Sequence, residues 1–278
     1  MRFAKYWTVA KNSSGNVTAR GWSDVSQDEA SRNAADRLQR ILDWLHHPAQ
    51  DLDRYRYVID DAICEQVIDR IESSDGREIA VISRNAYGSL ILNVTGVMII
   101  DIDVESTIAR PGIIARLFGA KAQTADAVME TKLDRIRAWQ RSHLDYTLRV
   151  YRTAAGLRVL VTNRLFESMD ASSLQVMIEL DSDPLYRELC KSQKCFRARL
   201  TPKPWRIGWK APAEKFPFAT QRHEQSFNEW YRSYCELAKS WAVCELLESI
   251  GNSPAHPTAQ QIIDLHDSFC CSPGLNLA

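Results

Sequence analysis

The amino-acid sequence predicts an α+β fold, with a mixed or antiparallel sheet core flanked by helices and a helical C-terminal region. Three observations lead to this prediction. Short alternating or apolar runs occur in pairs separated by glycine or small-residue turns, as in hairpins. Longer stretches with apolar residues at helical spacing lie between these pairs, and the chain from about Glu224 onward shows helical spacing alone.

The N-terminal part is expected to contain a strand and two helices. Residues 3–10 alternate between apolar and polar side chains, which indicates a strand. Ser26 and Glu29 have the spacing of a capping box, so a helix is expected from there to about His46. Residues 62–72 are expected to form a second helix.

The middle of the chain is expected to supply most of the sheet. Gly88 and Gly96 separate three apolar runs, and residues 89–103 are expected to form a hairpin. The remaining predictions, in chain order, are strands at 78–83, 89–95 and 97–103, a helix at 122–143, a hairpin of strands 145–152 and 157–163, an ambiguous segment at 171–180, a helix at 184–192, a strand at 195–200, and two or three helices with a break at 251–257.

We predict three regions along the chain. Residues 1–75 form an N-terminal strand-helix region packed on the core, residues 76–220 form the catalytic core, and residues 221–278 form the helical C-terminal region. The helix with Trp230, Tyr234, Leu237 and Trp241 carries an apolar stripe that suits the core, or a protein partner.

Composition favours a soluble, cytoplasmic protein with no membrane partner. No run of about 18 apolar residues occurs, and the N-terminus has no signal-like segment. The seven cysteines do not form CxxC pairs, so reduced thiols are expected rather than a zinc site. His266 and Asp267 are expected to be a pair on a helix surface. The formal net charge is zero, which argues against nonspecific coating of nucleic acid.

The segment MIIDID carries the clearest chemical signal. Its apolar residues predict a buried strand, and the strand ends in Asp101 and Asp103. Side chains two apart in a strand share a face, roughly 7 Å from each other, and paired carboxylates there suit Mg²⁺ or Mn²⁺. Glu105 is either a third ligand or a solvated residue past the strand end.

Two later segments could complete a site. The turn TAAG at 153–156 allows close approach of a ligand, and Arg158 follows it on a strand, where it could grip a phosphate. Asp181 and Asp183 follow an apolar residue, and Asp183 precedes a proline, as helix caps do. Beyond them, alternating cations share one face of a strand or follow it, namely Arg197, Arg199 and Lys203.

In this order the segments resemble the archaeo-eukaryotic primase superfamily, the primase-polymerases. That family carries an apolar strand ending in DxD or DxE, a small-residue turn before a strand with a histidine, a third acidic residue, and a later Arg/Lys segment. MIIDID, TAAGLRVLV and FRARLTPKP are similar to three of these motifs, over about residues 80–210.

The resemblance implies a metal-dependent nucleotidyltransferase that acts on nucleotides and on DNA or RNA in replication, with Mg²⁺ or Mn²⁺ as cofactor. By this resemblance, the catalytic metal ligands are Asp101, Asp103 and Asp181, with Asp183 as the alternative to Asp181. The nucleotide-binding residues are Thr153, Gly156, Arg158, Arg197, Arg199 and Lys203. Arg158 stands where the family has a histidine that contacts phosphates, and it brings a permanent charge instead of a titrating group.

Two other functions remain open. The stretch 195–222 contains seven basic residues interleaved with aromatic ones, a composition that suits either a solvated loop or a nucleic-acid or nucleotide-binding module that does not need metal. A metal-dependent nuclease would use the same carboxylates, and hydrolysis of a strand without added nucleotide would identify it.

Overall fold

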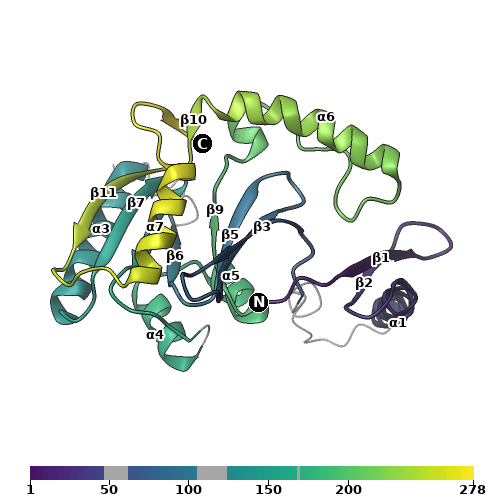
Figure 1. Ribbon diagram of the computed structural model, residues 1–278, viewed down its shortest axis with the longest axis horizontal. Helices are drawn as coiled ribbons and strands as arrows, with labels where there is room; N and C mark the ends of the chain where they lie inside the picture. The colour runs from purple at the N-terminus through teal and green to yellow at the C-terminus, as the bar shows by residue number, and fades with distance from the viewer. Residues whose placement is uncertain (47–61, 105–123, 168–169) are drawn as a thin grey trace, which may run out of the picture.

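The computed structural model describes residues 1–46, 62–104, 124–167 and 170–278 (Figure 1). Helices and antiparallel strands alternate along these residues, which confirms the predicted α+β class. In chain order the elements are β1 (Tyr6–Lys11), β2 (Thr18–Ser23), α1 (Gln27–His46), β3 (Gln66–Glu72), β4 (Glu78–Arg84), β5 (Leu90–Val94), β6 (Ile99–Asp103), α3 (Ala125–Ser142), β7 (Leu148–Thr153), β8 (Gly156–Val161), α4 (Ala171–Glu179), α5 (Pro184–Gln193), β9 (Phe196–Arg199), the 3₁₀ turn η2 (Pro204–Ile207), α6 (Gln221–Ala238), β10 (Trp241–Ala242), β11 (Cys244–Ile250), α7 (Pro257–Cys270) and β12 (Asn276–Leu277).

The first three elements form a small unit beside the rest of the protein, at the right of Figure 1. β1 and β2 pair as an antiparallel hairpin, and α1 packs on it. The Ser26 hydroxyl accepts the backbone N–H of Glu29 at 3.1 Å, as the capping box predicts. A Cβ on Gly21 would lie 2.2 Å from the backbone nitrogen of Ala34, so β2 and α1 can pack this closely only because residue 21 is glycine.

Two four-stranded sheets form the centre of the protein. Their strand orders are β3-β4-β5-β9 and β11-β7-β8-β6, and all pairings within them are antiparallel. The sheets meet where β6 lies beside β9. The Tyr186 hydroxyl bridges them, because it lies 2.8 Å from the carbonyl of Ile99 in β6 and 2.9 Å from that of Arg197 in β9.

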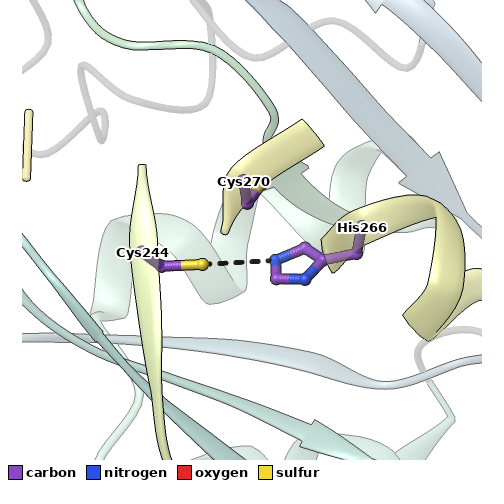
Figure 2. Close-up of side chains that lie close together, drawn as sticks. All are labelled: Cys244, His266 and Cys270. Carbon is purple, nitrogen blue, oxygen red and sulfur yellow. Dashed lines mark hydrogen bonds between the residues drawn. The ribbon is translucent and has the colours of Figure 1, made fainter. Parts of the chain in front are cut away.

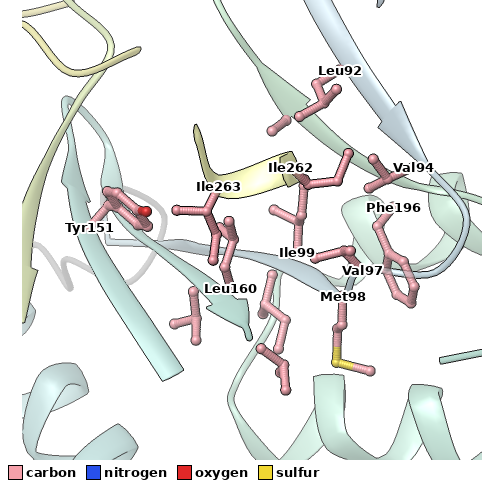
Figure 3. Packing of buried hydrophobic residues seen from close by; sticks show 14 of the residues in the cluster. Leu92, Val94, Val97, Met98, Ile99, Tyr151, Leu160, Phe196, Ile262 and Ile263 are labelled. Carbon is pink, nitrogen blue, oxygen red and sulfur yellow. The ribbon is translucent and has the colours of Figure 1, made fainter. Parts of the chain in front are cut away.

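One hydrophobic core spans both sheets. Figure 3 shows Ile262 and Ile263 of α7 among buried side chains of β5, β6 and β8. Ile99 and Leu160 are fully buried within this group. A buried aliphatic side chain of this size contributes about 1.5–3 kcal/mol, so α7 is anchored across the place where the two sheets meet.

Some sequence predictions were wrong. Residues 62–72 were expected to be helical, but β3 occupies most of that segment and pairs with β4. Residues 89–103 do not form a hairpin, because β5 pairs with β4 and β9, whereas β6 pairs with β8. The strands β2 and β11 were not predicted, and the ambiguous segment at 171–180 is the helix α4.

The other predicted elements appear within a few residues of their expected bounds. The three predicted regions stay a prediction, although β3 and β11 bring the first and the last of them into the central sheets. Within the described ranges, no helix combines the length and apolar character needed to cross a membrane.

Candidate functional site

The acidic end of β6 lies directly against the start of β8. In this antiparallel pair Asp101 is opposite Arg158, and Asp103 is opposite Gly156. A Cβ on Gly156 would lie 2.0 Å from the carbonyl oxygen of Ile102, so only glycine allows the two backbones to approach this closely. The Thr153 hydroxyl accepts the backbone N–H of Gly156 at 3.1 Å and holds the turn before β8.

Asp101 forms a buried ion pair with Arg158. The guanidinium Nε donates to the Asp101 carboxylate at 2.9 Å, and Nη1 donates to the backbone carbonyl of Arg199 at 3.1 Å. The Arg158 side chain is 3% exposed and that of Asp101 is 38% exposed. Burial acts to lower the pKa of Arg158, but the charge and hydrogen bond of Asp101, together with the nearby Cys270 and Cys244, outweigh it, and the pKa lies above its usual value.

A pocket of about 230 Å³ opens beside this pair. Its charged lining residues come from β6, β8, β9, η2 and the start of α5, and Tyr186 forms part of its wall. Three are acidic and four are basic: Asp101, Asp103, Asp183, Arg158, Arg199, Lys203 and Arg206. The mixture suits a ligand that carries several negative charges.

Arg199 is the cation in this pocket with the least compensation. Among the described residues, no side chain or carbonyl forms a hydrogen bond or ion pair with its guanidinium, although the residue is partly buried. Burial, opposed by Asp101 and reinforced by Arg158, lowers the pKa of Arg199 to about 10. An anion bound in the pocket would remove this electrostatic penalty.

The pocket gathers seven of the nine predicted site residues, namely Asp101, Asp103, Thr153, Gly156, Arg158, Arg199 and Lys203. It leaves out Asp181, which lies in the turn after α4 with φ of 61° and pairs with Lys132 at 2.9 Å and Arg135 at 3.1 Å. Asp183, the alternative third acid, does line the pocket, while its carboxylate also caps α5 by accepting the backbone N–H of Tyr186 at 2.7 Å.

Arg197 lies elsewhere as well. It is buried and pairs with Glu65 at 2.6 Å and with Gln193 at 2.6 Å. Its charge is therefore compensated within the protein. Glu105 lies outside the described residues.

Two exposed aromatic side chains stand near the pocket. The rings of Tyr87 and Trp205 meet edge to face, with centroids 5.1 Å apart, and both side chains are nearly half exposed. The Nζ of Lys203, a residue of the pocket lining, lies 5.7 Å from the Trp205 ring centroid. An exposed indole beside a pocket lined in part by basic residues is suited to stacking on a nucleobase.

Behind the pocket lies a buried cluster that the sequence analysis missed. Figure 2 shows Cys244 of β11 pointing at the imidazole of His266 in α7, with Cys270, also of α7, beside them. All three side chains are at most 1% exposed, so the expected helix-surface location of His266 was wrong. A helical pattern could have revealed it, because Ile262, His266 and Cys270 lie four residues apart on one face of α7.

The described carboxylates of the pocket do not form a group of three closely spaced metal-ligating side chains. In the described parts of the chain, one group of three metal-ligating side chains has its ligand atoms within 4.8 Å of one another, and it is the cluster of Cys244, His266 and Cys270. Thiols and imidazole do not match the preference of Mg²⁺ for oxygen ligands. A place for Mg²⁺ or Mn²⁺ among the acidic residues stays a prediction.

No family model, curated protein or solved structure matches this chain, so the chemistry of its residues alone supports a functional assignment.

Proposed function

We propose that this protein is a nucleotide-binding module that holds the phosphates of a nucleotide, free or within a nucleic-acid strand, in the pocket beside β6. The observation that carries this proposal is Arg199, a partly buried guanidinium that lines the pocket without a hydrogen-bond partner among the described residues. A phosphate oxygen would accept its hydrogen bonds and compensate its charge. Lys203 and Arg206 line the same pocket and add positive charge around the phosphate.

The other parts of the site suit the rest of a nucleotide. Trp205 presents an exposed ring beside Lys203, where a base could stack while its phosphates reach the pocket. Arg158 donates its Nε to Asp101 of β6 and one Nη to the Arg199 carbonyl of β9. We therefore assign Arg158 mainly to holding the ends of these strands together, and not to binding the ligand by itself.

The test compares Arg199→Ala with Arg222→Ala, a change of an exposed basic residue in α6 that does not line the pocket. ATP and a short single-stranded DNA are titrated calorimetrically. Loss of a charged hydrogen bond is worth about 1.5–3 kcal/mol, so Arg199→Ala should weaken binding at least about 10-fold, and Arg222→Ala should not. Because Arg199→Ala relieves a buried charge, the variant should fold. Equal affinities for the two variants would refute the proposal.

The stacking role is tested separately. Trp205→Phe keeps a smaller ring at the same place, and Trp205→Ala removes it. Base stacking contributes about 1–3 kcal/mol, so ATP affinity should fall in the alanine variant and be largely retained in the phenylalanine variant. Inorganic triphosphate, which has no base, should bind both variants equally.

Metal-dependent nucleotidyl transfer is the second candidate. One observation favours it: Asp183 joins Asp101 and Asp103 in the pocket, and its backbone N–H donates to the Asp101 carbonyl at 3.0 Å. Incorporation of labelled NTP in the presence of Mn²⁺ or Mg²⁺, lost in Asp103→Asn and Asp183→Asn, would establish it. Asparagine keeps the cap of α5, so the second variant should stay folded. Strand hydrolysis without NTP would instead identify a nuclease.

A further inference from the structure

The buried cluster behind the pocket has the composition of a zinc site. Cys244 begins β11, and His266 and Cys270 lie one helical turn apart on α7. Their ligand atoms all lie within 4.8 Å of one another, and Cys244 Sγ is 3.9 Å from His266 Nε2 (Figure 2). Thiolate and imidazole are the ligands that Zn²⁺ takes in structural sites.

A fourth ligand is within reach. Cys271 Sγ lies 3.8 Å from Cys244 Sγ. In a tetrahedral site with Zn–S bonds of about 2.3 Å, two sulfur atoms are separated by about 3.8 Å. The Cys244–Cys271 spacing therefore matches two corners of such a tetrahedron. Cys271 is not among the three residues whose ligand atoms all lie within 4.8 Å of one another, so its thiol has to move closer to them to complete a Cys₃His set.

The surroundings of His266 provide independent support. Its Nδ1 lies 2.8 Å from an Asp267 carboxylate oxygen. That carboxylate is held in turn by the Tyr151 hydroxyl at 2.8 Å and by Arg149 at 2.7 Å. A carboxylate that accepts the Nδ1 proton leaves Nε2 with its lone pair, and Nε2 is the atom that faces Cys244. Zinc-ligating histidines are commonly oriented in this way.

A cation lies beside the cluster. Zn²⁺ with three thiolates carries one net negative charge, and Arg158 Nη1 lies 3.2 Å from His266 Nε2. The buried guanidinium, which also pairs with Asp101, would therefore reduce the cost of burying that net charge. A metal on Nε2 replaces this one contact, while Arg158 keeps Asp101 and the Arg199 carbonyl.

We propose that Cys244, His266, Cys270 and Cys271 bind one Zn²⁺ ion that fastens α7 to β11 behind the pocket. Each thiol gives its proton to solvent when it binds the metal. The site is structural, because its three buried ligands and the fourth thiol leave no open position for a substrate. It does not depend on the proposed nucleotide binding.

The test measures metal directly. Chelator-treated, reduced full-length protein is titrated with Zn²⁺ against a chromophoric competitor, and with Co²⁺ to observe the absorption bands of tetrahedral thiolate coordination. We expect one equivalent per chain and an increase in Tm on Zn²⁺ addition. Cys244→Ser should lose both effects, whereas Cys190→Ser, which alters a buried thiol outside the cluster, should keep them.

A second variant tests the site without removing a ligand, in case Cys244→Ser does not fold. Asp267→Asn leaves all four ligands in place and weakens the support of His266, together with the contacts to Tyr151 and Arg149, so the Zn²⁺ affinity should fall about 10- to 100-fold. The proposal is overturned if the wild-type protein takes up no Zn²⁺, if Cys190→Ser loses it equally, or if Asp267→Asn binds as tightly as wild type. Quantitative recovery of a Cys244–Cys271 disulfide in protein that binds no metal would assign the cluster to redox chemistry instead.

Discussion

Asp101→Asn tests whether this carboxylate is the counter-ion of Arg158. Arg158 is buried and carries a permanent charge, and among the described residues Asp101 is the one that forms an ion pair with it. The asparagine side chain has nearly the same shape and can still accept the Nε hydrogen bond. The substitution therefore removes the negative charge and little else.

The expected size follows from the geometry. Two unit charges about 4 Å apart interact by about 4 kcal/mol at an effective dielectric constant of about 20. Asp101 is 38% exposed, so solvent screens part of this energy, and Arg158 retains the Arg199 carbonyl. We expect Asp101→Asn to lower the free energy of unfolding by about 2–3 kcal/mol. Domains typically have about 5–15 kcal/mol of stability, so the variant should remain folded.

The assay is urea unfolding of chelator-treated protein, with Arg158→Met and the double variant completing a thermodynamic cycle. If the loss comes from an uncompensated buried cation, Asp101→Asn should cost little in the Arg158→Met background. A coupling energy above about 1 kcal/mol is expected. Additive effects, or a loss below about 1 kcal/mol in the single variant, would show that the pair does not stabilise the fold.

Two further substitutions test local features of the fold. Gly156→Ala should lower the free energy of unfolding by about 3 kcal/mol, because its Cβ would overlap the Ile102 carbonyl. Gly96→Ala is the control, because a Cβ there makes only ordinary contacts. Urea unfolding of both variants measures the difference. Asp170→Ala removes the cap of α4 and should cost about 1 kcal/mol at pH 7. The hydrogen bond from Ser173 lowers the pKa of Asp170 in the folded protein. The stabilisation by the cap is therefore present above the unfolded-state pKa and is lost as the pH falls through the folded-state pKa. The difference in unfolding free energy between wild type and Asp170→Ala should be smaller near pH 2 than at pH 7.

Local patterns predicted most elements but not how the strands pair. β5 is buried on both faces, and β6 is buried except at Asp101 and Asp103, so the burial of these strands does not reveal which strands they pair with. The short Gly96 break between them suggested a hairpin, yet β6 crosses into the other sheet. There it pairs with β8, and the backbone N–H of Val161 continues the contact to the Met98 carbonyl. Such long-range pairing cannot be deduced from a short connection.

β3 was mistaken for a helix because its residues do not alternate cleanly. Its segment QVIDRIE places charged residues on both sides, and bulges shift its register against β4 at two places. A strand at the sheet edge is half solvated, so its burial pattern is irregular. Because the segment shows neither the helical nor the strand period, its pairing with β4 determines that it forms a strand.

Most of the candidate site was predictable from residues on strands or in the turns and loops directly beside them. Asp101 and Asp103 were found because the apolar run before them marks a strand end. The choice between Asp181 and Asp183 depends instead on a turn, since Asp181 adopts φ of 61° and faces Lys132 rather than the pocket. Sequence spacing does not specify such a conformation for a non-glycine residue.

Arg158 connects the two proposed sites and determines how each can work. Its guanidinium remains charged at any physiological pH, so a divalent metal at Asp101 would face a cation 2.9 Å from the same carboxylate. A metal is therefore better placed on the phosphates of a ligand than on Asp101. On the other side, Zn²⁺ at His266 would remove one hydrogen-bond acceptor from Arg158 and leave it with Asp101 and the Arg199 carbonyl. If both proposals hold, zinc and nucleotide affinities are linked through this side chain, and the linkage must be equal in both directions.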